Sequence, residues 1–356
     1  MLKNIPFSAT TLFDFLHTLG WLRCSGELLP DGSLKIRGAI ALPNTRQGTY
    51  QVMVNDSPAK QVTLNLPGDP IFHYHGYHPL TGDPGFEFII NANEKPPFRI
   101  WIADKNGNRI NHWYQDWIHL PPTSLPFPSP DLQLRNNATS DDWYHFGGGT
   151  FAAKLPDVIK RYDTRSPNDF RSVLDWGCGT GRITRHLPAI FPHATITAVD
   201  IDSEAIHWMQ ATTPGIDCKL SPPNPPMPIR DGSIDLVISH SVFSHIDENS
   251  AFKWLEDLHR ITAPNGLVLA STLSHLAPFI LPIDKIPAEA FSTQGFCCFD
   301  NKLVEYCITK EGYSVQRLAY QSYEYIKQKW SAYFEIIDIL DGYADFLALV
   351  VMRKRD

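Results

Sequence analysis

The chain of 356 residues contains few cysteines, and none is spaced as a metal ligand or a redox motif. Its six cysteines lie at positions 24, 178, 218, 297, 298 and 307, so no pair has Cys-x-x-Cys spacing. The adjacent Cys297 and Cys298 cannot easily form a disulfide with each other. We therefore expect neither a disulfide framework nor a structural zinc site. A reducing compartment fits this cysteine usage.

Long apolar runs are also missing. No run reaches the roughly 18 residues that a transmembrane helix needs. The apolar N-terminus carries Asp14 and lacks the basic region and the small-residue cleavage site of an export signal. We expect residues 1–19 to form a short helix, and these absences favour a cytoplasmic protein without a membrane partner.

Positive charge is scarce as well. The chain has 31 Lys and Arg residues against 38 Asp and Glu residues, a formal net charge of -7 at pH 7. Proteins that bind nucleic acid usually gather positive charge on one face, so we expect no nucleic-acid partner. Hydrophobic residues make up 43% of the chain, which is enough for two domains with cores of their own.

Short strand patterns separated by turn signals fill residues 20–119. They are SLKIRGAIAL (33–42), TYQVMVN (49–55), QVTLNL (61–66), FEFIINA (86–92) and FRIWIAD (98–104). Turn signals such as Pro30-Asp31-Gly32 separate them. This spacing predicts an all-β antiparallel sandwich, followed by a semi-rigid, proline-rich linker over residues 120–142.

From residue 143 to residue 356 the pattern changes to alternating strands and helices. The strand patterns cover 172–175, 195–199, 216–219, 234–239 and 267–272, and the helical patterns cover 182–191, 203–211 and 251–262. This alternation predicts an α/β domain with a doubly wound parallel sheet. Two further strand patterns flank Gly342, and we expect them to form a hairpin at the edge of that sheet.

A glycine-rich turn directly follows the first of these strands. After Asp175 and Trp176 the chain reads Gly-Cys-Gly-Thr-Gly over 177–181, and Asp200 ends the next strand. Glycines let the backbone approach a ligand closely, and a carboxylate such as Asp200 can accept hydrogen bonds from ribose hydroxyls. The sequence therefore predicts a site for a nucleoside-bearing ligand. The ligand is not NAD, because Arg182 stands where the NAD fingerprint requires its third glycine.

Four motifs in order resemble those of the class I S-adenosylmethionine-dependent methyltransferases. They are VLDWGCGTGR (173–182), AVDID (198–202), DGSIDLVISHSVFSHI (231–246) and APNGLVLAS (263–271). The resemblance covers residues 143–356 and implies a Rossmann-like fold, S-adenosyl-L-methionine as the cofactor and methyl transfer as the activity. It also implies a set of cofactor-binding residues: Asp175, Gly177, Cys178, Gly179, Gly181, Asp200, Ile201, Asn224 and Ser239.

The stretch Asn224-Pro225-Pro226-Met227 looks like the catalytic Asn-Pro-Pro-aromatic motif of enzymes that methylate adenine or glutamine nitrogens. In those families the motif follows the fourth strand, whereas here it precedes strand 234–239. Met227 also lacks the aromatic face that would stack on a flipped base. The resemblance instead places this loop at the cofactor. Pro223 stands where the family often has an acidic residue, so we expect Asn224 or a backbone group to contact the adenine.

Residues just after the fourth and fifth strands are expected to meet the substrate, because ligands bind beyond the carboxyl ends of parallel strands. His240 is our candidate general base, since an alcohol nucleophile benefits from one. The alternative is a histidine that packs against the cofactor or hydrogen-bonds to it. We expect the aromatic-glycine segment 141–151 to cover the cofactor and the long segment 274–300 to be a lid. The predicted substrate contacts are Tyr144, Phe146, Ser241, His245, His275, Phe296, Tyr320 and Tyr323. For Tyr144 and Phe146 the alternative is that they pack the linker against the core, and for His245 it is a structural role.

The histidine-rich motif HYHGYH (73–78) lies in the predicted sandwich. Without a cysteine or carboxylate at fitting spacing we favour a sugar-contacting or domain-packing surface over a metal site. The sequence thus predicts a methyltransferase for a small-molecule substrate, with O-methylation of a sugar or secondary metabolite favoured. An N- or S-methyltransferase and a catalytically silent cofactor-binding sensor stay open, as does a homodimer.

Overall fold

The computed structural model of the protein describes residues 21–41, 50–66, 85–136, 140–274, 277, 294–300, 312 and 317–355. The predicted helix over residues 1–19, the HYHGYH motif, His275 and most of the predicted lid lie outside these ranges. None of the helices within them combines the length and the apolar character that a membrane crossing requires.

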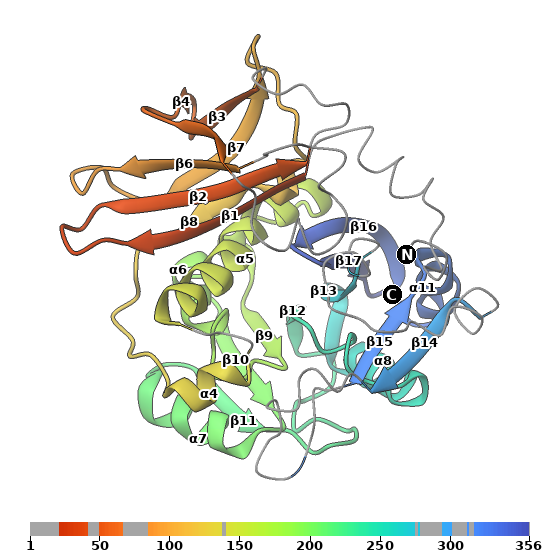
Figure 1. Cartoon of the computed structure of the whole chain (residues 1–356). Coiled ribbons are helices and arrows are strands. Elements are labelled where there is room, and N and C mark those ends of the chain that lie inside the picture. Colours follow the sequence, from red (N-terminus) through yellow and green to blue (C-terminus); the bar gives the residue numbers. More distant parts are fainter. Residues whose placement is uncertain are drawn as a thin grey trace.

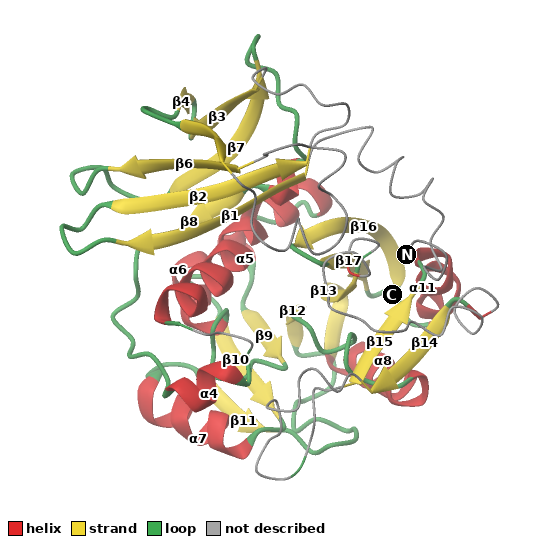
Figure 2. Cartoon of the chain, viewed as in Figure 1, coloured by secondary structure: helices red, strands yellow, loops and turns green. Residues whose placement is uncertain are grey.

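The N-terminal part contains two four-stranded antiparallel sheets that share one hydrophobic core (Figures 1 and 2). The first sheet contains, in spatial order, β1 (Trp21–Leu28), β2 (Leu34–Ala41), β6 (Gly85–Ile90) and β5 (Thr63–Leu66). The second contains β4 (Ser57–Pro58), β3 (Tyr50–Val54), β7 (Phe98–Asp104) and β8 (Trp117–His119). Ile100 and Ile102 alternate with more exposed residues along β7, as a half-buried strand requires. The predicted sandwich is confirmed.

The C-terminal part is a seven-stranded sheet with helices on both faces. Its strands lie in the order β11 (Asp217–Leu220), β10 (Thr195–Asp200), β9 (Ser172–Trp176), β12 (Ile234–Ser239), β13 (Thr262–Leu273), β17 (Leu347–Arg353) and β16 (Glu335–Ala344). The first five are parallel, and β17 and β16 pair antiparallel at the edge. The predicted doubly wound sheet and its edge hairpin are confirmed. The hairpin turns at residues 345–346, after Gly342.

The helices and the remaining strands complete the molecule. The α-helices are α4 (Pro130–Leu134), α5 (Asp141–Tyr162), α6 (Leu187–Ile190), α7 (Ser203–Thr212), α8 (Glu248–Ile261) and α11 (Tyr323–Lys329). Short 3-10 turns are η2 (Trp113–Gln115), η3 (Pro167–Asp169), η4 (Thr184–His186) and η6 (Trp330–Ala332). Strands β14 (Phe296–Asp300) and β15 (Arg317–Gln321) form a separate antiparallel pair.

One predicted helix is wrong in its extent. The sequence predicted a continuous helix over 182–191, whereas the structure has an irregular turn, then η4 and the four-residue helix α6. Pro188 lacks the N–H group that would bond to the carbonyl of Thr184, which disfavours a continuous helix at this point. The side chain of Thr184 instead donates to Asp175 Oδ2 at 2.6 Å.

Helix α5 lies between the sandwich and the doubly wound sheet (Figure 1). Phe146 in its first half packs into the core of the sandwich, and Phe151 packs into the core of the sheet. The glycines that precede Phe151 allow a close approach, because a Cβ on Gly148 would lie 2.1 Å from the carbonyl oxygen of Arg182. The predicted cover segment 141–151 is thus helical. The division of the chain into domains stays a prediction.

Candidate functional site

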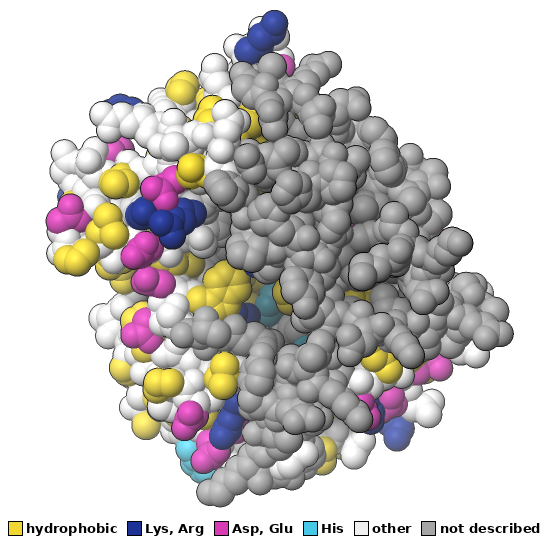
Figure 3. All heavy atoms as spheres, viewed as in Figure 1, with side chains coloured by type: hydrophobic (Ala, Val, Ile, Leu, Met, Phe, Trp, Pro, Cys, Tyr) yellow, Lys and Arg dark blue, Asp and Glu magenta, His cyan; other side chains and the backbone are white. Residues whose placement is uncertain are grey.

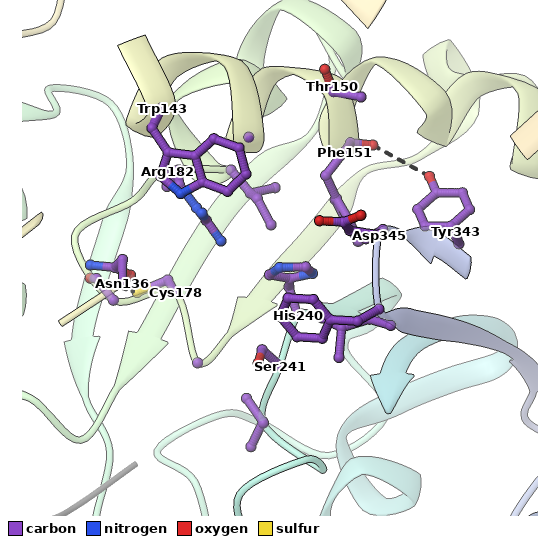
Figure 4. A pocket seen from close by; sticks show the side chains of 18 of the residues that line it. Asn136, Trp143, Thr150, Phe151, Cys178, Arg182, His240, Ser241, Tyr343 and Asp345 are labelled. Carbon is purple, nitrogen blue, oxygen red and sulfur yellow. Dashed lines mark hydrogen bonds between the residues drawn. The ribbon is translucent and has the colours of Figure 1, made fainter. Parts of the chain in front are cut away.

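A cavity of about 630 Å³ lies between the sandwich and the carboxyl ends of β9, β10 and β12. Hydrophobic side chains and histidine border the hollow between the two parts in the space-filling view (Figure 3). His240 lies between two groups of lining side chains (Figure 4). We call the two groups the glycine-turn end (Asn136, Trp143, Cys178 and Arg182) and the hairpin end (Thr150, Phe151, Tyr343 and Asp345).

The glycine turn must be glycine at two positions. Gly177 has φ 77°, and a Cβ there would lie 2.1 Å from Val242 Cγ2. Gly179 has φ 54°, and a Cβ there would lie 2.2 Å from Asn136 Oδ1. Side chains at both positions would therefore be strained and would collide with the wall of the cavity.

Asp200 fixes this turn and keeps free acceptor positions. Its Oδ2 accepts from the backbone N–H of Gly179 at 2.7 Å, and its Oδ1 accepts from that of Asp202 at 2.9 Å. Burial raises the pKa of Asp200, while these two backbone donors oppose the rise. Because each carboxylate oxygen has two acceptor positions, both oxygens can still accept a hydrogen bond from a ligand hydroxyl.

Asp175 lies on β9, two residues before Gly177, and offers a second acidic group to the cavity. Its Oδ2 is held by Thr184, whereas its Oδ1 has no hydrogen-bond partner in the described part of the chain. Burial raises the pKa of Asp175 to about 7, against the hydrogen bond from Thr184. A ligand ammonium beside this carboxyl would favour its ionised form.

The end of the predicted linker closes over the glycine turn. Arg135 donates to both oxygens of Asp202 at 3.0 and 2.8 Å and to Glu204 at 2.6 Å. Asn136 Nδ2 donates to Thr180 Oγ1 at 2.9 Å. The sequence analysis missed both residues, because a single Arg-Asn pair after a proline-rich stretch carries no periodic or motif signal.

His240 follows β12 and is half-buried in the middle of the cavity wall. Its ring lies edge-on to Phe151, with 4.6 Å between the ring centroids. Burial, then the charges of Arg182 and Lys154, and then His245, hold the pKa of His240 well below its usual range. The imidazole is therefore neutral at pH 7.

Two cations, Arg182 and Lys154, line the cavity. Arg182 is half-buried, and it makes no hydrogen bond or ion pair to any residue in the described ranges. Figure 4 shows its guanidinium reaching into the cavity beside Trp143. Lys154 is buried and donates to the backbone oxygens of Tyr114, at 2.8 Å, and of Tyr343. Burial lowers the pKa of Lys154 to about 7.

An ion pair that the sequence analysis missed lines the hairpin end of the cavity. Arg23 Nη2 on β1 lies 3.0 Å from Asp345 Oδ2 at the tip of the β16–β17 hairpin. Asp345 has φ 62°, and Ser241, which also lines the cavity, has φ 64°. Left-handed backbone at residues other than glycine is strained and gathers at functional sites.

The cavity brings together more than half of the residues that the sequence analysis proposed. Those in its lining are Asp175, Gly177, Cys178, Gly179, Asp200, Ile201, His240, Phe146, Ser241 and His245. Ser241 Oγ lies 3.1 Å from His245 Nε2, and His245 Nδ1 lies 2.8 Å from the backbone oxygen of Arg317.

The structure does not bring the remaining proposed residues to the cavity. They are Gly181, Asn224, Ser239, Tyr144, Phe296, Tyr320 and Tyr323. Asn224 is exposed, and its neighbours Ser221 and Pro223 line the cavity instead. Ser239 is fully buried.

The aromatic members of this remaining group are held elsewhere. The hydroxyl of Tyr144 donates to the backbone oxygen of Thr180 at 2.7 Å, and that of Tyr323 donates to Asp341 at 2.5 Å. Phe296 and Tyr320 are buried in small hydrophobic clusters.

Residues 173–266 match the family described as "Methyltransferase domain". Over these residues the chain carries a methyltransferase domain. This domain contains the glycine turn, Asp200 and His240.

Curated relatives match about a third of this chain. A malonyl-[acyl-carrier protein] O-methyltransferase from Erwinia billingiae is 36% identical over 118 residues, covering 33% of this chain and 44% of the relative. One from Halalkalibacterium halodurans is 31% identical over 132 residues, covering 34% and 46%. A ribosomal RNA small subunit methyltransferase C from Haemophilus ducreyi is 32% identical over 137 residues, covering 38% and 41%. The chain thus spans less than half the length of these relatives.

Solved structures of methyltransferases are also similar. One of a SAM-dependent methyltransferase from Aquifex aeolicus has a TM-score of 0.37 and 17% identity, covering 57% of this chain and 96% of the other. A 1,6-didemethyltoxoflavin-N1-methyltransferase from Burkholderia thailandensis has a TM-score of 0.40 and 16% identity, covering 66% and 94%.

Proposed function

We propose that the protein is an enzyme that transfers the methyl group of S-adenosylmethionine to a small-molecule acceptor, with oxygen favoured as the acceptor atom. One observation carries the proposal: the glycine turn, Asp200 and His240 line a single cavity. The cavity volume of about 630 Å³ falls in the usual range for small-molecule sites. The net charge of -7 opposes a nucleic-acid acceptor.

The acidic side chains beside the glycine turn match the groups of the cofactor. Asp200 would accept hydrogen bonds from the ribose hydroxyls, and Asp175 would bind the ammonium of the methionine part. When bound, the cofactor supplies an electrophilic methyl group on a sulfonium. These residues would fix its position, which is most of what an in-line methyl transfer requires of a protein.

The test uses S-adenosylmethionine labelled in its methyl group, incubated with the enzyme and a cell lysate that is then separated by size. Label in the small-molecule fraction is the expected result. Label in protein or nucleic acid would contradict the proposed acceptor class. Saturable cofactor binding with no transfer to any fraction would favour the silent sensor instead.

A further inference from the structure

A serine with strained backbone follows β12 beside the proposed cofactor site. Ser241 has φ 64°, and its backbone N–H donates to Ser271 Oγ on the neighbouring strand β13 at 2.7 Å. The next residue, Val242, approaches the glycine turn so closely that a Cβ on Gly177 would lie 2.1 Å from Val242 Cγ2. Ser241 therefore lines the cavity one residue away from the contact with the glycine turn (Figure 4).

The hydroxyl of Ser241 is hydrogen-bonded to the ring of His245, which also lines the cavity. His245 Nδ1 lies 2.8 Å from the backbone oxygen of Arg317, and because a carbonyl oxygen only accepts, Nδ1 carries a hydrogen. In the neutral ring Nε2 then has the lone pair, and Ser241 Oγ donates to it across 3.1 Å. We call Ser241 and His245 the serine–histidine pair.

The oxygen of Ser241 keeps one position at which it can accept a proton. Ser241 Oγ lies 3.1 Å from Ser244 Oγ, and because the hydrogen of Ser241 is directed to His245, Ser244 is the donor between the two hydroxyls. A hydroxyl oxygen has two acceptor positions, so one of them is left for a ligand. Strand β15 holds this arrangement, since Ala319 N–H donates to the backbone oxygen of Ser244 at 2.8 Å.

His240 is less suited to take up a proton than the serine–histidine pair. Burial, with the charges of Arg182 and Lys154, holds the pKa of His240 well below its usual range. A general base works best when its pKa lies near the working pH. The Nδ1 atom of His240 is buried and has no hydrogen-bond partner among the residues that the structure describes. No group therefore orients this ring at Nδ1, whereas Arg317 orients His245.

We infer that the acceptor carries a hydroxyl group and that the serine–histidine pair removes the proton of this group. This inference rests on the proposed function. The acceptor hydroxyl donates to the remaining acceptor position of Ser241 Oγ. As its oxygen attacks the methyl carbon, Ser241 Oγ takes up the hydroxyl proton and passes its own hydrogen to His245 Nε2. The carbon–sulfur bond breaks and the sulfur keeps the electron pair. The products are a methyl ether, S-adenosylhomocysteine and a protonated His245, which releases its proton to solvent.

Variants of the serine–histidine pair test the inference, with methyl-labelled S-adenosylmethionine as the donor and the small-molecule fraction of the lysate as the source of the acceptor. Ser241→Ala and His245→Gln should each lower the initial rate of label transfer at least about 100-fold, while cofactor affinity stays unchanged. The double variant should lose no more than either single variant, because both residues act on one proton. His207→Gln, at an exposed position on α7, is the control and should keep the wild-type rate. A smaller loss in the folded single variants would overturn the inference.

The pH dependence of the rate distinguishes proton transfer from a structural role of His245. The wild-type rate should fall by up to about tenfold per unit as the pH is lowered and His245 takes up a proton. His245→Gln should lose this dependence over the range in which both proteins stay folded. The charged side chains of the segments that hold His245, Asp247 and Arg317, lie 3.4 Å apart as an ion pair, and His240 stays neutral. An equal slope in His245→Gln would overturn the inference.

The chemistry of the labelled product gives a check that needs no variant. Methyl ethers survive mild alkali, whereas methyl esters are hydrolysed and release volatile methanol. We expect the label to stay with the product, and mass spectrometry to place the methyl group on oxygen. Label that becomes volatile, or a methyl group on nitrogen or sulfur, would overturn the inference and leave the proposed function standing. No transferred label in any fraction would overturn the proposed function itself.

Discussion

Arg23 and Asp345 join the sandwich to the edge of the doubly wound sheet, with 3.0 Å between Arg23 Nη2 and Asp345 Oδ2. Both residues line the cavity, so the pair forms part of its wall at the hairpin end. A ligand that enters this end therefore meets a wall to which both parts of the chain contribute.

Removal of either partner of this pair should destabilise the protein. Because both side chains are largely buried, we expect Arg23→Met or Asp345→Asn to lower the free energy of unfolding by about 1–3 kcal/mol. The double variant should lose less than the sum of the single losses. Urea unfolding of all four proteins measures this coupling, and additive losses would mean that the pair contributes nothing as a pair.

Gly177→Ala should affect both stability and the cofactor. The substitution places a Cβ on a residue with left-handed backbone and against Val242. We therefore expect the free energy of unfolding to fall by at least about 3 kcal/mol, and cofactor binding to become too weak to measure. Gly107→Ala is the control, since Gly107 has φ 85° with nothing within 4 Å of its Cβ position. That control should cost about 1–2 kcal/mol from backbone strain alone. If thermal or urea unfolding showed the same loss of stability in Gly177→Ala and Gly107→Ala, the contact with Val242 would not be its cause.

The pH dependence of kcat/KM should show whether the charged form of Lys154 is the active one. Asp116 and Asp345 favour the charged form of Lys154, whereas burial and Arg99 hold its pKa at about 7. The charged form of Lys154 makes the stronger hydrogen bonds to the backbone oxygens of Tyr114 and Tyr343 beside the cavity, so kcat/KM should fall by up to about tenfold per unit as the pH rises above 7. Base catalysis by His240 alone would instead leave kcat/KM level above pH 7, because the imidazole is already neutral there.

Three buried histidines should make the junction between the sandwich and the rest of the chain sensitive to acid. Ring centroids of His119 and His186 lie 5.7 and 5.6 Å from that of His145. Burial, followed by neighbouring histidines, lowers the pKa of His119 to about 4 and that of His186 to about 3. Burial lowers the pKa of His145 too, and Arg185 adds to the effect at His145 and His186.

The sign of the effect follows from these depressed pKa values. Above pH 6.5 the folded and unfolded chains both hold neutral histidines, whereas below it only the unfolded chain takes up protons. Stability is therefore lost as the pH falls from about 6.5 towards 4, by about 1–3 kcal/mol per histidine. Melting temperatures between pH 7.5 and 4.5 measure this loss, and His186→Phe should reduce the slope. If the melting temperature of His186→Phe fell with pH as steeply as that of the wild type, His186 would not contribute to the acid sensitivity.

The sequence predicted those parts of the site that lie next to one another along the chain. The glycine turn and Asp200 each follow a strand with a clear pattern, and His240 follows the next one. Arg23, Lys154 and Asp345 come from elements far apart in sequence, and each is a single charged residue without a periodic neighbour. These residues meet at one cavity only because α5 packs between the sandwich and the doubly wound sheet.

The prediction that aromatic side chains contact the substrate needed their tertiary neighbours, which the sequence does not give. Tyr144 and Tyr323 were expected at the substrate, but their hydroxyls bind to Thr180 and Asp341. Which way an aromatic side chain points depends on its tertiary neighbours, and a sequence pattern cannot supply them. Proline alone did not decide the break before Pro188 either, because α5 runs through Pro156 although that residue also lacks the N–H group of a helical hydrogen bond.

Calorimetric titration of S-adenosylmethionine into the wild-type protein and into Asp200→Ala tests the central claim most directly. We expect Asp200→Ala to lower cofactor affinity at least about tenfold, because the ribose loses its carboxylate and the turn at Gly179 loses its acceptor. Asp217→Asn, at an exposed site on β11, is the control and should bind like the wild type. Unchanged affinity in Asp200→Ala would contradict the account, because the glycine turn and Asp200 would then not form the cofactor site.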